Sequence, residues 1–260
     1  MKQCQLIKKQ DTKMLTIKSG LVAVLLLILS ACATTDVSQN SAQPAEMDDE
    51  YGVLMTFSER ERAGTAVFKS VMFVNNKYLY LSDDNFPGDF VLFDRKKKTI
   101  FSVTRANQTV FVIKPKGVTG EPPIKITYEE ESQPSSAIPK VSGRIATHYR
   151  YNANGTHCYD AVTLEKTFLP GVVAAMKEYR TVLAGEHAST VHKMPVDTHN
   201  ACDLAVNIYH ATKHLETGLP LREWDQKGYL KFMVDYKMNF KMDPKQLEIP
   251  AEFKEFSVGS

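Results

Sequence analysis

No apolar run in this sequence is long enough to cross a membrane. A spanning helix needs about 20 consecutive apolar residues, whereas the unbroken run at 21–29 has only nine. Five lysines precede this run, and the small residues Ser30 and Ala31 follow it. This order of basic, apolar and small residues is typical of a secretory signal. We therefore expect residues 1–31 to form a signal peptide that is cleaved from the mature chain.

Cysteine is scarce, with four in the chain, and one of the four lies directly after the apolar run. Residues Leu29, Ser30, Ala31 and Cys32 resemble the lipobox of bacterial lipoproteins. The resemblance implies cleavage before Cys32, lipidation of its sulfur, and anchoring to a membrane through acyl chains such as palmitate. Ala33 resembles an outer-membrane sorting signal, which implies a cell-envelope protein facing the periplasm. The alternative is an ordinary cleaved signal followed by a coincidental cysteine.

Two cysteines remain once Cys4 is removed with the leader and Cys32 is acylated. Cys158 and Cys202 are separated by 44 residues, and an oxidising periplasm favours their pairing. Closing such a loop stabilises a fold by roughly 4 kcal/mol in the chain-entropy estimate. The alternative is a reactive thiol at Cys158 beside His157. Adjacent residues on an extended chain point to opposite sides, however, so we expect the disulfide.

Net charge is also low. Residues 1–31 carry five lysines and one aspartate, so their removal turns the formal net charge of +2 into −2. A weakly acidic chain has no sequence-wide reason to bind nucleic acid. We therefore expect no nucleic-acid partner.

The usual catalytic motifs are absent. The sequence has no Gly-x-Ser-x-Gly, Cys-x-x-Cys, phosphate-binding glycine loop or His-Glu-x-x-His. We expect no cofactor, no metal, no catalytic residues and no enzymatic activity. An enzyme stays open as an alternative, because catalytic residues can be scattered along a chain.

One histidine pair has the spacing of metal ligands. His210 and His214 would share a face of a helix, and His187, His192 and His199 lie in or near the preceding loop. Zinc takes at least three protein ligands, so we favour a solvated helix face without metal.

The remaining chain divides into a tether and one domain. Residues 32–49 are small and polar with no recurring apolar face, as expected of a flexible tether. Residues 50–257 are long enough to form a single periplasmic domain with its own core. Residues 51–113 alternate apolar and polar positions between turn residues, which predicts an antiparallel meander. We expect further strands at 124–129, 143–151 and 158–162.

Two helices follow these strands. The first should begin near Pro170 and end at Gly185, because Val172, Met176, Tyr179 and Leu183 recur on one face. The second should begin at Asn200, with Asp203 three residues on, and carry Leu204, Ile208 and Leu215 on its apolar face as far as Gly218.

The last strand has the sharpest alternation in the chain. Apolar and polar residues alternate from Lys231 to Met242, which predicts one strand of about 40 Å, at 3.3 Å per residue, in a strongly curved sheet. We predict an α+β fold in which two amphipathic helices pack on the concave face of a curved antiparallel half-barrel. The expected lining of a cavity there is Phe232, Val234, Tyr236, Met238, Phe240, Met176, Leu183, Leu204 and Ile208. The alternative is that these residues form a filled core.

This order of meander strands, two helices and a long returning strand resembles the half-barrel carriers of the LolA, LolB and LppX-like type. The resemblance is architectural, and no residue motif carries it. It implies a non-catalytic protein that binds a hydrophobic ligand, a lipid or a lipidated partner. The alternative is an envelope scaffolding lipoprotein with a solid core.

Overall fold

The computed structural model describes residues 47–136 and 138–257. The predicted signal peptide, Cys32 and most of the predicted tether lie outside the described residues. Within the described ranges, no helix combines the length and the apolar character needed to span a membrane.

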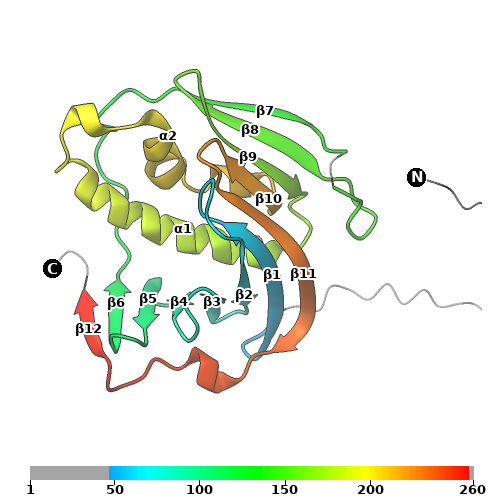
Figure 1. Cartoon of the computed structure of the whole chain (residues 1–260), viewed down its shortest axis with the longest axis vertical. Helices are drawn as coiled ribbons and strands as arrows, with labels where there is room; N and C mark the ends of the chain where they lie inside the picture. The colour runs from blue at the N-terminus through cyan, green and yellow to red at the C-terminus, as the bar shows by residue number, and fades with distance from the viewer. Residues whose placement is uncertain (1–46, 137, 258–260) are drawn as a thin grey trace, which may run out of the picture. The chain divides into compact units, whose positions relative to one another are not determined.

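The described residues form one twelve-stranded sheet in the order β12-β6-β5-β4-β3-β2-β1-β11-β10-β9-β8-β7 (Figure 1). Every pairing is antiparallel except that of β12 with β6. The predicted α+β class with an open curved sheet is confirmed. The strands are β1 Tyr51–Arg60, β2 Phe68–Val74, β3 Tyr78–Asp83, β4 Phe90–Asp94, β5 Thr99–Thr104, β6 Thr109–Ile113, β7 Tyr128–Pro134, β8 Thr147–Ala153, β9 Thr156–Leu164, β10 Leu219–Asp225, β11 Leu230–Lys241 and β12 Lys254–Ser257.

The chain enters at the middle of the sheet. It runs outward through the meander β1 to β6, crosses to the opposite edge at β7, and returns inward through β8 and β9. The helices come next, and β10 and β11 then close the sheet against β1. Figure 1 shows α1 lying between the two arms of the curved sheet. The concave side of the sheet is therefore the side that the helices cover.

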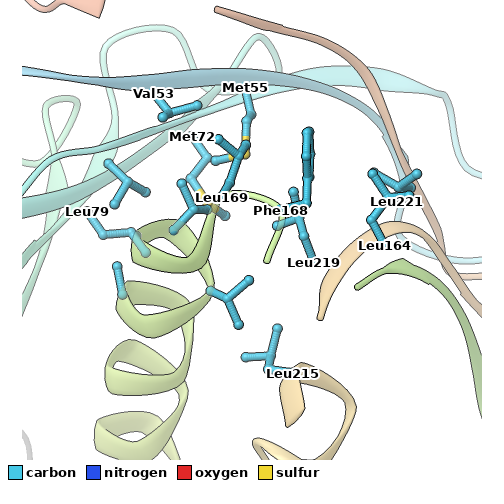
Figure 2. Packing of buried hydrophobic residues seen from close by; sticks show 14 of the residues in the cluster. Val53, Met55, Met72, Leu79, Leu164, Phe168, Leu169, Leu215, Leu219 and Leu221 are labelled. Carbon is cyan, nitrogen blue, oxygen red and sulfur yellow. The ribbon is translucent and has the colours of Figure 1, made fainter. Parts of the chain in front are cut away.

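The main apolar core lies between α1 and the strands. Figure 2 shows Val53, Met55 and Met72 from β1 and β2 converging on Phe168 and Leu169, which immediately precede the helix. Further residues of this cluster come from β3, β4, β5, β9, β10 and the segment before β10. Burial of these side chains fixes the helix against the concave face.

A second apolar cluster lies on the opposite face of the sheet. The chain after β11 packs Met242, Leu247, Ile249 and Phe253 against buried side chains of β2 to β6. It ends in β12, which pairs with β6. The sequence analysis did not predict β12 or β10, and it placed the strand before β8 at 124–129 instead of Tyr128–Pro134.

Helix α1, Pro170–Val191, begins where Pro170 predicts but does not end at Gly185. The glycine has another role, because a Cβ built there would lie 1.9 Å from the carbonyl oxygen of Lys116. Gly185 therefore lets the loop after β6 approach the helix backbone, and the helix continues through it.

The predicted second helix is present as three short segments. Asn200 caps its start, since its side chain accepts hydrogen bonds from the backbone N–H groups of Cys202 and Asp203. Helix α2, Ala201–Leu204, leads into a π-helical turn, Ala205–Tyr209 (η2). A turn at 210–212 separates this from a 3-10 helix, Lys213–Glu216 (η3). The break changes which residues share a face.

Candidate functional site

A cavity of about 580 Å³ lies on the concave side of the sheet. Its floor comes from β2, β3, β9, β10 and the start of β11, and its roof from α1, α2 and η2. Ligand sites in proteins typically occupy about 300–1,000 Å³. The size of this cavity suits a small molecule.

One wall of the cavity is apolar. Met72 of β2 and Leu79 and Leu81 of β3 face Met176 and Tyr179 of α1 across it. These strand residues share a face because they occupy paired or alternate positions, with Met72 opposite Leu81 in the β2–β3 pairing. This wall offers methionine and leucine surface to an alkyl group.

The other wall is polar and is built from four different elements. Tyr159 comes from β9, Arg180 from α1, His214 from η3 and Glu223 from β10. His214 Nε2 lies 3.8 Å from Glu223 Oε1. The Tyr159 and His214 rings meet edge to face with centroids 5.6 Å apart. The Arg180 side chain donates to the carbonyl oxygens of Ala211 and Val206 at 3.4 and 3.2 Å.

Burial dominates the electrostatics of this wall. It lowers the pKa of His214 to about 3, with the charges of Arg180 and Lys177 acting in the same direction. It raises the pKa of Glu223, although Lys231 and Arg180 partly oppose the shift. His214 is therefore neutral at physiological pH, and the charged form of Glu223 is disfavoured.

Two ion pairs lie at the edges of the cavity. Lys231 Nζ is 2.9 Å from Glu59 Oε1, and the same ammonium lies 4.3 Å from the centre of the Phe57 ring. Lys227 Nζ is 3.2 Å from Asp203 Oδ1. Both lysines already have a carboxylate partner.

The disulfide lies beside the cavity. Cys158 of β9 and Cys202 of α2 are joined, and both line the cavity. The neighbouring His157 is within 2.7 Å of the buried Asp160 carboxylate, which also contacts His148 at 2.7 Å. The disulfide ties α2 to β9 at the cavity wall, and the contact of Asp160 with His148 links β9 to β8.

Of the nine predicted lining residues, Met176 is among those that line this cavity, and the other eight lie elsewhere. Leu183, Tyr236 and Met238 pack on the main core, and Leu204 and Ile208 are buried with the C-terminal part of α1. Phe240 packs in the cluster on the opposite face. Phe232 and Val234 are 39% and 58% exposed. The nine residues therefore do not all share one face.

Two irregularities in β11 explain this division. Between Thr56 and Phe57 of β1, the partner in β11 moves from Asp235 to Met233, so Val234 is an extra residue. A second shift falls between Phe240 and Lys237, around Asn239, whose φ is +53°. Each extra residue turns the following side chains to the other face of the sheet.

The histidine pair of the sequence analysis is also divided. His210 stacks on Tyr128 with ring centroids 4.4 Å apart, whereas His214 faces the cavity. The helix breaks between them, so i, i+4 spacing does not bring their rings together. In the ranges 47–136 and 138–257, no group of three or more His, Cys, Asp or Glu side chains is arranged to hold a metal ion.

The sequence analysis missed Tyr159, Arg180 and Glu223. A signal was present for Arg180, which follows Tyr179 and lies four residues after Met176 within the apolar stripe of α1. Glu223 lies two residues after the buried Leu221 in β10, a strand that was not predicted. A charged residue at a core-facing position is costly to bury and often marks a functional site.

No protein-family model matches this sequence, and no curated protein matches it in sequence. Among solved structures, the chain is similar to an uncharacterized conserved protein from Thermus thermophilus, with a TM-score of 0.41 and 10% identity over 80% of this chain and 91% of that one. It is similar to PNGF-II with a TM-score of 0.40 and 10% identity, over 80% of this chain and 31% of that one. For MucB the TM-score is 0.36 at 12% identity, over 81% of this chain and 61% of that one. Because these scores are below 0.5, we base no functional argument on them.

Proposed function

We propose that this protein is a non-enzymatic binding protein of the cell envelope whose cavity holds a small amphipathic molecule. The observation that carries this proposal is the division of the cavity into two walls. Met72, Leu81 and Met176 present apolar surface, while Arg180 and Glu223 present polar groups on the other side. A ligand with an alkyl part and a polar part would complement both walls.

The location in the envelope is proposed from the sequence. The signal-like leader and the lipobox around Cys32 support an acylated protein, anchored in the outer membrane and facing the periplasm. Residues 32–49 would then form the tether to a single domain at 50–257. Labelling cells with radioactive palmitate should mark the wild-type chain and leave a Cys32→Ser variant unlabelled. Equal labelling of both would overturn the anchor.

Native mass spectrometry tests the binding function. The full chain carrying Cys32→Ser would be purified without detergent, so that a retained molecule adds to the protein mass. We expect a bound species of a few hundred daltons that is released on unfolding. A mass equal to that of the polypeptide alone, even after incubation with envelope lipids, would favour the scaffolding alternative.

A catalytic function is the second candidate, because Arg180, His214 and Glu223 converge in one cavity. The same experiment separates it from binding. A binding protein releases the molecule that it took up unchanged, whereas an enzyme releases a product of different mass.

A further inference from the structure

The lysine and arginine side chains that line the cavity, Arg180, Lys227 and Lys231, differ in their partners. Lys227 and Lys231 each form an ion pair, with Asp203 and Glu59. Among the described residues, no carboxylate forms such a pair with Arg180. Unlike the two lysines, the Arg180 guanidinium is therefore available to form an ion pair with a ligand.

The position of Arg180 is fixed while much of its hydrogen-bonding capacity stays free. Its Nε and Nη2 atoms donate to the carbonyls of Ala211 and Val206. A guanidinium carries five N–H groups in a rigid planar fork, so further donors remain on a side chain that these carbonyls orient. Such a fork matches the two oxygens of a carboxylate or phosphate.

The Tyr159 hydroxyl is a second, independent observation. The residue is 8% exposed and lines the cavity, and its buried oxygen has no hydrogen-bond partner within the described ranges. Buried polar groups in folded proteins nearly always have partners, because leaving one without a partner is costly. A ligand atom in the cavity would provide the partner that this hydroxyl lacks.

The remaining polar groups favour an anion over a cation. Burial raises the pKa of Glu223, and this favours its neutral form, which does not repel an oxyanion. Burial lowers the pKa of His214, and the positive charges of Arg180 and Lys177 lower it further, so these two side chains would repel a cation placed beside His214. An ammonium group would meet that same repulsion.

We infer that Arg180 and the hydroxyl of Tyr159 form a subsite for an oxyanion, the carboxylate or phosphate end of an amphipathic ligand. The alkyl chain of the ligand lies against Met72, Leu81 and Met176. This inference rests on the proposed binding function, and it names the chemistry that the polar wall selects.

Four ligands with the same twelve-carbon chain test the inference: dodecanoate, dodecyl phosphate, dodecanol and dodecylammonium. Their affinities would be measured by calorimetry, below their micelle concentrations, with the full chain carrying Cys32→Ser. We expect at least one of the two oxyanions to bind about tenfold more tightly than the alcohol and the ammonium. Whichever of dodecanoate and dodecyl phosphate binds more tightly identifies the head group.

Matched variants locate the effect. Arg180→Gln should weaken oxyanion binding about tenfold and change alcohol binding less than about twofold. Tyr159→Phe, which removes only the hydroxyl, should weaken oxyanion binding by a few-fold. Lys227→Gln is the control, because it removes one positive charge from an exposed lysine at the edge of the same cavity. Lys227→Gln should keep the preference for the oxyanions over the alcohol and the ammonium.

The outcomes separate the two proposals. If none of the four molecules binds, the proposed binding function is wrong and the subsite with it. If dodecanol or dodecylammonium binds as tightly as the oxyanions, the subsite is wrong while the binding function stands. Equal losses in Arg180→Gln and Lys227→Gln would also overturn the subsite, because they would show a general charge effect. If Arg180→Gln does not fold, Tyr159→Phe decides.

Discussion

Arg95 and Glu178 connect the tip of the β4–β5 hairpin to α1 through two hydrogen bonds. The Nε atom of Arg95 donates to Oε2 of Glu178 at 2.9 Å, and Nη2 donates to Oε1 at 3.3 Å. Lys98, from the same hairpin tip, lies 3.1 Å from Oε2. The basic turn at 95–98 therefore holds the helix that forms part of the cavity roof.

We expect Glu178→Gln to destabilise the protein at pH 7 and to have less effect in acid. Burial alone would raise the pKa of Glu178, but the hydrogen bonds from Arg95 and Lys98 outweigh it and lower the pKa below 4.5. A carboxylate with a lowered pKa stabilises the fold above its unfolded pKa of about 4.5, and this stabilisation is lost as the pH falls through the folded value. The expected loss at pH 7 is roughly 1–2 kcal/mol in urea unfolding.

Glu216→Gln is the control for Glu178, since the Lys213–Glu216 pair is exposed. An exposed pair contributes little, about 0–1 kcal/mol. A loss at pH 7 as large for Glu216→Gln as for Glu178→Gln would contradict the role assigned to the hairpin.

His214 should also make the stability of the protein depend on pH. Burial, aided by Arg180 and Lys177, lowers its pKa to about 3. Between about pH 3 and 6.5 the unfolded chain binds a proton that the folded chain does not, so this residue makes stability rise with pH. Urea unfolding from pH 4 to 6.5 should show a smaller slope in His214→Gln than in the wild type. An unchanged slope would show that His214 is charged in the fold.

Gly185→Ala should destabilise the protein, although alanine normally favours a helix by about 1 kcal/mol over glycine. The added Cβ would lie 1.9 Å from the Lys116 carbonyl oxygen. We expect a net loss of about 1–3 kcal/mol in thermal or urea unfolding. Gly117→Ala, in the same loop, has no atom within 4 Å of the new Cβ and should cause no such loss. A gain in stability for Gly185→Ala would contradict the close contact between loop and helix.

The Cys158–Cys202 bridge should contribute up to about 4 kcal/mol, because it closes a loop of 44 residues. Helix α2 has only four residues and depends on tertiary contacts for its stability. Reduction should therefore lower the urea midpoint and speed hydrogen exchange at 201–209 more than in α1. The double variant Cys158→Ser/Cys202→Ser should have the urea midpoint of the reduced protein, and adding reductant should not change that midpoint. A wild-type midpoint that reductant does not change would contradict this account.

The sequence predicted the fold class because its signals are local. Alternation in the meander, Pro170 at the start of α1 and the Asn200 cap depend on neighbours in the chain, and the structure contains all three. The predicted end of α1 at Gly185 was wrong, because the role of this glycine depends on Lys116, which lies far away in the sequence.

The cavity was less predictable because its polar residues come from separate elements. Tyr159, Arg180 and Glu223 lie on β9, α1 and β10, and none of them stands out within its own segment. The alternation in β11 was misleading for a related reason. The extra residues at Val234 and near Asn239 are set by pairing with β1, and the pattern of β11 alone does not reveal them.

The central claim is that a ligand occupies the cavity under α1, and photocrosslinking tests it most directly. A fatty acid with a diazirine in its chain would be irradiated with the full chain carrying Cys32→Ser, and the modified peptides mapped. We predict labels within 68–83 and 170–191, the segments that carry the apolar wall, which dodecanoate in excess should suppress. Labels confined to the exposed Phe232 and Val234 region, or no label at all, would contradict the claim.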